Sequence, residues 1–234
     1  MRLLYFLLIV VLATACSEST TELNEKGKRF LDAGAYKEAV AIFNQSIAKE
    51  KTFDAFNMRA VAFINLEALE QAASDFSEAI LLDSTNYKAF YNRGNVYREQ
   101  KKLEEALADY NKAIQLKPNL ADLYVNRSAV LFEMHQMQLA MADLDFAAQL
   151  DAQNPVIYFN KGKIFVVLDS AQQASEQFTA AIELNSQYAD AYYWLGLTQV
   201  YVDNLEAACQ NLSQALALGH PDAQSTMDQY CKAQ

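Results

Sequence analysis

Along most of the chain, stretches of about 13 residues with apolar positions at helical spacing alternate with short polar turns. Ala33-Gly34-Ala35 and Leu168-Asp169-Ser170 are two of these turns. Apolar residues that recur every three or four positions line one face of a helix. Three prolines and six glycines are too few for a β-sandwich with many tight turns. The pattern therefore predicts an all-α protein built from pairs of helices.

Small residues recur at a fixed interval and show that the helix pairs are repeats. One column contains Gly27, Ala60, Gly94, Ser128, Gly162 and Gly196. A second column, 12 residues further on, contains Ala39, Ala72, Ala106, Ala140, Ala174 and Ala208. In both columns the first interval is 33 residues and the other four are 34. Two helices can approach closely only where their contact positions lack bulk, so we expect these columns to lie between the helices of each pair.

One copy of the repeat resembles a known signature. The residues Phe90, Gly94, Tyr97, Ala106, Tyr110, Ala113 and Pro118 resemble the tetratricopeptide repeat almost column for column. The resemblance implies a right-handed α-solenoid of six helix hairpins over residues 20–222, with a capping helix in 223–234. The expected repeats, numbered 1 to 6, are 20–52, 53–86, 87–120, 121–154, 155–188 and 189–222.

Opposite charges occupy two columns of the central repeats. The predicted structural ion pairs involve Arg59, Asp75, Arg93, Asp109, Arg127 and Asp143. Two arrangements are open: a pair within one repeat, as Arg59 with Asp75, or a pair with the next repeat, as Asp75 with Arg93. The second arrangement would also give Lys161 a partner in Asp143.

In the tetratricopeptide family the first helix of each repeat lines a concave groove. The candidate groove residues are Tyr91, Asn92, Asn95, Asn126, Phe132, Phe159, Asn160, Tyr193, Trp194 and Tyr201. Asn92, Asn126 and Asn160 share one repeat position, and such a ladder of carboxamides could hold the backbone of an extended peptide. The alternative is that asparagine is simply common at this position.

The aromatic residues towards the carboxyl end, with the single tryptophan Trp194 among them, predict a contact site for a partner. The alternative is that the capping helix covers them. Family members that bind chaperone tails hold a terminal carboxylate with groove lysines and arginines. Because the corresponding positions here are Asp122, Asn126, Val156 and Asn160, we do not expect that function.

The first 15 residues resemble a bacterial lipoprotein signal peptide. Arg2 precedes an apolar run that is too short to span a bilayer and that ends in Ala13-Thr14-Ala15 directly before Cys16. The resemblance implies that Cys16 carries acyl chains, palmitate among them, and that 16–19 is a short tether. Ser17 after the cysteine implies sorting to the outer membrane. The alternative is an ordinary secretory signal followed by an incidental cysteine.

The net charge, the cysteines and the histidines limit the classes of ligand and reaction that the sequence predicts. A formal net charge of -10 without a basic stripe argues against nucleic acid. Cys209 and Cys231 are expected to form a disulfide between the last repeat and the capping helix, with two buried free thiols as the alternative. No metal site, cofactor or small-molecule substrate is expected. His135 and His220 are expected to be solvated, with no nucleophile beside them.

The sequence therefore predicts a non-enzymatic scaffold that binds protein partners or extended peptide segments through its groove. Its expected place is the bacterial cell envelope, held by lipid in the outer membrane and facing the periplasm. The alternative function is that of a pilotin-like assembly factor for an outer-membrane complex.

Overall fold

A computed structural model describes residues 18–231 of the protein, and within this range the chain forms helices and no strands. The lipid-attachment candidate Cys16 lies outside the described residues. The helices are α1 (Thr20–Asp32), α2 (Tyr36–Lys49), α3 (Phe53–Asn65), α4 (Leu69–Leu82), α5 (Tyr87–Glu99), α6 (Leu103–Leu116), α7 (Ala121–Glu133), α8 (Met137–Leu150), α9 (Pro155–Val167), α10 (Ala171–Leu184), α11 (Ala189–Tyr201), α12 (Leu205–Ala217) and α13 (Ala223–Tyr230).

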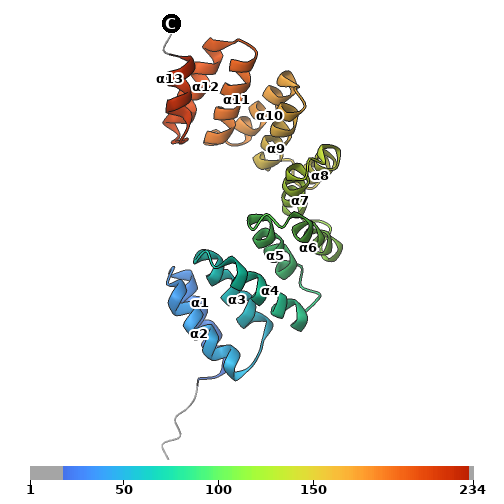
Figure 1. The fold of residues 1–234 in the computed structure, drawn as a ribbon, viewed down its shortest axis with the longest axis vertical. Helices are drawn as coiled ribbons and strands as arrows, with labels where there is room; N and C mark the ends of the chain where they lie inside the picture. The colour runs from blue at the N-terminus through green and yellow to red at the C-terminus, as the bar shows by residue number, and fades with distance from the viewer. Residues whose placement is uncertain (1–17, 232–234) are drawn as a thin grey trace, which may run out of the picture.

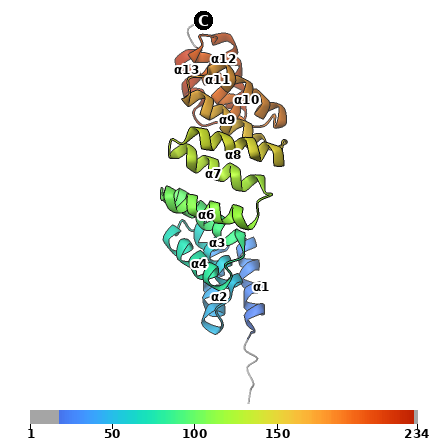
Figure 2. The same ribbon diagram turned by 90° about the vertical axis from the view of Figure 1, so that its right-hand side faces the viewer.

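Consecutive helices pair as hairpins, and the hairpins stack into a curved array (Figure 1). Each of the first six pairs falls inside one expected repeat, and α13 follows the last pair. The pairs succeed one another along the long axis, with α7 and α8 lying across it (Figure 2). The predicted all-α solenoid is confirmed.

The column of small residues lies where the two helices of each repeat meet. A methyl group added to Gly27 would lie 2.5 Å from Phe43 Cε1, and one added to Gly162 would lie 2.5 Å from Phe178 Cε1. Phe43 and Phe178 are fully buried. Each small residue therefore makes room for the large side chain 16 positions later, as the sequence predicts.

The turns inside the repeats share a left-handed residue. Positive φ angles occur at Gly34, Glu67, Lys101, His135, Asp169 and Asp203, the same position in all six repeats. In repeat 3 the Lys101 N–H donates to the Arg98 carbonyl at 2.9 Å and the Lys102 N–H donates to the Tyr97 carbonyl at 2.8 Å. These bonds form the motif that ends a helix through one left-handed residue, for which glycine is the usual choice. Only repeat 1 has glycine there.

At this left-handed position glycine should stabilise the protein relative to any residue with a side chain. His135→Gly should raise the free energy of unfolding by about 0.5 to 1 kcal/mol, because a left-handed conformation is costly for a side chain. Gly34→Ala should lower it by about 1 kcal/mol although open space surrounds Gly34. Urea denaturation would measure both. Ala108→Gly, on the exposed side of α6, is the control and should destabilise by about 1 kcal/mol; a stabilising effect there would contradict the conformational explanation.

In repeats 2, 3 and 4 an ion pair connects the two helices of the same repeat. Arg59, Arg93 and Arg127 donate from Nε and Nη2 to both carboxylate oxygens of the aspartate 16 residues later, at 2.6 to 2.8 Å. Of the two arrangements that the sequence leaves open, the structure has the first, in which each arginine pairs with the aspartate of its own repeat. The hydrogen bonds to the aspartates are the largest influence on the pKa of Arg93 and Arg127 and raise both.

The same arginines also donate hydrogen bonds to polar side chains of the preceding repeat. Nη1 of Arg93 donates to Ser77 Oγ at 2.9 Å, and the Nη1 atoms of Arg59 and Arg127 donate to Asn44 and Asn111. Lys161 continues this second column, because its Nζ lies 2.7 Å from Asp145. The pairing of Lys161 with Asp143, which the other arrangement would have given, does not form, because Asp143 pairs with Arg127.

Among residues 18–231, none of the helices is long and apolar enough to cross a bilayer.

Candidate functional site

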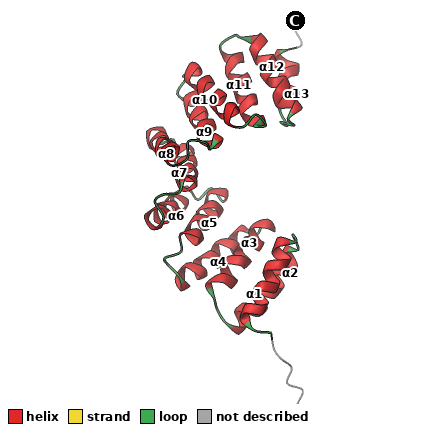
Figure 3. Cartoon of the chain, turned by 180° about the vertical axis from the view of Figure 1, so that it is seen from behind, coloured by secondary structure: helices red, strands yellow, loops and turns green. Residues whose placement is uncertain are grey.

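The array curves so that α6 and α8 lie on its outer side, while α5 and α7 lie on the inner side (Figure 3). The inner side is where the sequence predicts a groove lined by first helices. The groove changes character along the chain: amide and charged side chains dominate in repeats 3 to 5, and apolar ones in repeat 6.

Repeat 3 and the start of repeat 4 form a hydrogen-bonded polar cluster. The Asn126 amide donates to the Tyr91 hydroxyl at 3.1 Å and to the Asp122 carbonyl at 2.8 Å, while its oxygen faces Arg98 Nη1 at 3.4 Å. The Tyr110 hydroxyl donates to Asn95 Oδ1 at 2.5 Å. Burial is the main cause that raises the pKa of Tyr110, which keeps the phenol protonated as a donor.

These bonds change the interpretation of the asparagine ladder. Asn126 already uses both ends of its amide within the protein. Asn160 instead lines a pocket, and no hydrogen bond within residues 18–231 is recorded for Asn92 or Asn160. Asn57, on the first helix of repeat 2, has a buried Oδ1 without a hydrogen-bond partner among the described residues. The three ladder positions are therefore not equivalent: within the described part of the chain Asn92 and Asn160 have free amides, whereas the amide of Asn126 between them is already hydrogen-bonded.

A pocket of about 310 Å³ lies between repeats 4 and 5 on the groove side. Its lining residues are Lys101, Ser128, Ala129, Phe132, Glu133, Asn160, Lys163 and Ile164. Lys101 pairs with Glu133 at 2.8 Å. The Lys163 ammonium lies 5.3 Å from the centre of the Phe132 ring and 5.8 Å from that of Phe159, a cation–π arrangement.

A second pocket of about 230 Å³ lies between repeats 5 and 6. Its lining residues are Val166, Asp169, Ser170, Ala171, Trp194, Leu197, Thr198 and Tyr201. Tyr201 is 68% exposed, and the hydrogen bond from its hydroxyl to Asp169 raises its pKa. Val166 in the lining is also exposed, at 36%. Exposed apolar surface around a pocket is typical of a contact site.

Two predicted groove residues are not free. Phe159 is only 9% exposed and packs on Phe178 and Tyr188, with ring centres 5.8 and 5.0 Å away. Tyr193 stacks on His220 at 3.9 Å, and its hydroxyl lies 3.2 Å from Thr226 Oγ1 on α13. We therefore assign Phe159 to the core and Tyr193 to the interface with the capping helix.

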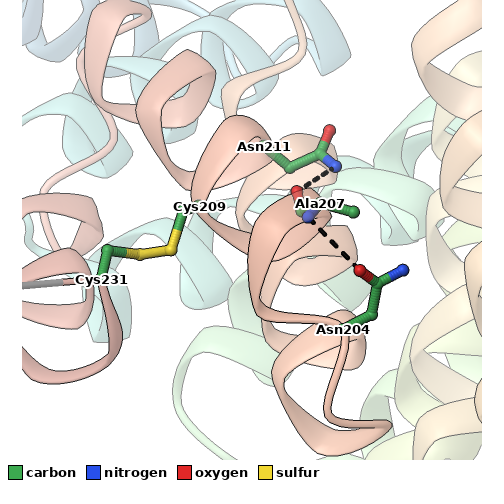
Figure 4. The surroundings of a disulfide bond; sticks show 5 residues. All are labelled: Asn204, Ala207, Cys209, Asn211 and Cys231. Atoms are coloured by element: carbon green, nitrogen blue, oxygen red, sulfur yellow. Dashed lines mark hydrogen bonds between the residues drawn. A yellow bond between two sulfur atoms is a disulfide. The ribbon is translucent and has the colours of Figure 1, made fainter. Parts of the chain in front are cut away.

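The capping helix covers the end of the array through α11 and α12. Ala223 and Thr226 of α13 are buried, while Met227 and Tyr230 are only half-buried. A disulfide joins Cys209 of α12 to Cys231 at the end of α13 (Figure 4). His220 is not solvated as expected, because only 8% of its side chain is exposed.

The disulfide should control the local stability of α13. A helix of eight residues is too short to be stable alone, and the bond closes a loop over a separation of 22 residues. Cys231→Ser should therefore lower the stability of the capping helix by about 3 kcal/mol. Hydrogen exchange of the α13 amides would measure this, with α3 to α6 unchanged. Adding reductant to the wild-type protein should have the same effect; α13 amides that remain protected would contradict the prediction.

Comparisons with known proteins agree with this geometry. Family models described as tetratricopeptide repeat match residues 24–87 and 76–108, and one described as TPR repeat matches residues 94–135. The chain is a tetratricopeptide repeat protein. No curated protein matches it.

Several solved structures resemble this tetratricopeptide repeat protein. YrrB, described as a TPR protein with an unusual peptide-binding site, is 27% identical over 80% of this chain and 97% of its own, with a TM-score of 0.58. PilW, a type IV pilus biogenesis factor, is 17% identical over 89% of this chain and 98% of its own, with a TM-score of 0.79. PilF of Pseudomonas aeruginosa is 19% identical over 90% of this chain and 97% of its own, with a TM-score of 0.74.

The sequence interpretation missed two groove cations, Arg98 and Lys163. The signal was present, because Arg98 and Lys163 fall on first-helix positions that face the groove in the repeat register. Neither residue falls on a position at which chaperone-binding members of the family hold a carboxylate. Within residues 18–231 no group of three or more His, Cys, Asp or Glu side chains is placed to hold a metal ion.

Proposed function

We propose that this tetratricopeptide repeat protein is a scaffold that binds an extended segment of a partner protein along the concave side of repeats 3 to 6. The observation that carries the proposal is the open apolar pocket beside Trp194, which lies next to the polar groove pocket lined by Asn160. Tryptophan in such a pocket is typical of the residues that dominate binding energy. The 27% identity to YrrB, described as having a peptide-binding site, supports this proposal.

The scaffold is proposed to act in the bacterial cell envelope, held in the outer membrane by acyl chains on Cys16 and facing the periplasm. The support is the short apolar leader that ends in Ala13-Thr14-Ala15 before Cys16. Cys16→Ser should move the protein from the membrane fraction to the soluble fraction. A variant that stays with the membranes would remove the lipid anchor from the proposal.

The groove assignment is tested by affinity purification from envelope membranes. Trp194→Ala should weaken capture of the partner by about 30-fold, as expected for a central aromatic contact, and Asn160→Ala should weaken it less. The matched control is Leu81→Ala, which removes a 78% exposed apolar side chain from α4, a second helix. If both groove variants retain the partner as the wild type does, the proposed surface is wrong.

A second candidate function is assembly of an outer-membrane complex. It is kept because of the likeness to PilW, which at 17% identity is a likeness of fold. The two functions differ in the effect of deletion: an assembly factor is needed for the multimers of a pore, whereas a scaffold is needed only for recruitment. Loss of heat-resistant pore multimers from envelope membranes on deletion would favour assembly.

A further inference from the structure

Lys163 and Arg98 are the half-buried groove cations that lack a carboxylate partner. Neither forms an ion pair with any of the residues between 18 and 231. By contrast, the partly buried cations at the repeat junctions, such as Arg93 and Lys161, all have an aspartate. In a chain with a formal net charge of -10, groove cations without a carboxylate partner are unexpected unless a ligand supplies the carboxylates.

The surroundings of Lys163 suit a carboxylate. Its ammonium lies over the Phe132 ring in the pocket of about 310 Å³, and Asn160 lines the same pocket with its amide unused. The face of an aromatic ring attracts an ammonium, and a carboxylate beside that ammonium would accept a charge-assisted hydrogen bond. Glu133 in this pocket is already paired with Lys101. The local charge at the pocket is therefore positive.

The apolar pocket lies next to this site. Both pockets use α9: Asn160, Lys163 and Ile164 line the first, and Val166 lines the second. Lys163 and Val166 are one helical turn apart. Neighbouring helices pack about 8 to 10 Å apart, and an extended chain in the polyproline II conformation advances about 3.1 Å per residue with every third side chain on the same side. A peptide that crosses α9 would therefore fill the two pockets with side chains about three residues apart.

We infer that the groove binds an extended peptide that carries a carboxylate at Lys163 and a bulky aliphatic or aromatic side chain in the pocket beside Trp194. This inference rests on the proposed function, since it names the ligand of the same groove. The carboxylate comes either from an Asp or Glu side chain or from the carboxyl end of the partner chain. Arg98, further along the groove, attracts the acidic segment at longer range.

The intrinsic fluorescence of Trp194, the single tryptophan, tests the inference directly. The intact chain is titrated with blocked ten-residue peptides of glycine and serine that carry one leucine and, three residues from it, glutamate or glutamine. A third peptide has the glutamine sequence but ends in a free carboxylate three residues after the leucine. The protein variants are Lys163→Met and, as the matched control, Lys117→Met, which removes one exposed charge elsewhere.

The glutamate peptide should bind the wild type about five- to tenfold more tightly than the glutamine peptide. Lys163→Met should abolish this ratio, and Lys117→Met should preserve it. Preference for the free carboxylate alone would also support the inference and would identify the chain end as the source. Equal binding of all three peptides, each with a change in the Trp194 signal, would overturn the inference and leave the proposed function standing. If no peptide changes the Trp194 signal, the proposed groove function falls as well.

Discussion

Replacing Asp109 with alanine is expected to destabilise the protein by about 3 to 5 kcal/mol. Only 7% of the Asp109 side chain is exposed, and it accepts hydrogen bonds from Nε and Nη2 of Arg93 at 2.7 and 2.8 Å. Without the carboxylate, a guanidinium that is only 19% exposed keeps its charge and loses its partner. The free energy of unfolding from urea denaturation measures the effect.

Two comparisons separate this explanation from a general effect of substitution. The double variant Arg93→Met/Asp109→Leu should recover most of the loss, because removing both partners leaves no unpaired charge. Lys101→Ala breaks a pair in which the lysine is 74% exposed, and it should cost no more than about 1 kcal/mol. If Asp109→Ala proved as mild as Lys101→Ala, the buried pair would not have the role assigned to it.

Replacing Phe178 with alanine is expected to cost about 3 to 5 kcal/mol, because it empties the space between the helices of repeat 5. Phe178 is fully buried, and its ring centre lies 5.8 Å from that of Phe159 and 6.3 Å from that of Trp194. The emission of Trp194 should therefore change along with the stability. Thermal and urea denaturation, followed at this tryptophan, measure both effects.

The effect of Gly162→Ala should change sign with the residue at position 178. In the wild type the new methyl group would lie 2.5 Å from Phe178 Cε1, so we expect a loss of about 1 to 2 kcal/mol despite the better helix propensity of alanine. With alanine at 178 the same change should stabilise by about 1 kcal/mol. Repeat 2 has Ala60 opposite Phe76, so an alanine beside a phenylalanine is compatible with the repeat. The cost in repeat 5 therefore arises because its two helices already pack at the shorter distance that glycine allows. The same sign in both backgrounds would contradict this packing account.

The repeat pattern was sufficient to predict the helices. The expected repeat 87–120, for example, contains α5 and α6 and the turn between them. This was possible because each hairpin contacts only its neighbours, so that the same residue types recur at the same spacing for the same local reason. The Asn-Pro sequence at 154–155 starts α9 in the same local way, since Asn154 Oδ1 accepts from the Val156 N–H at 3.0 Å.

The register of the ion pairs could not be predicted in the same way. Asp75 and Asp109 occupy one column, so the spacing allows Arg93 to reach either of them. The structure separates the two directions, because Nε and Nη2 reach Asp109 while Nη1 reaches Ser77 of the preceding repeat. Side-chain reach, rather than sequence spacing, determines this outcome.

By itself, the sequence determined six pairs of closely packed helices, because small residues recur at a fixed interval where two helices meet, and its resemblance to the tetratricopeptide signature implied the solenoid and its cap. Only the tertiary structure decided which groove positions are open. Phe159 and Tyr193 share one repeat position, yet Phe159 is buried by Phe178 and Tyr188, and Tyr193 is covered by His220 and α13. The physical reason is that the accessibility of a side chain depends on which side chains pack against it, both from its own repeat and from the cap, and a repeat register specifies position but not neighbours.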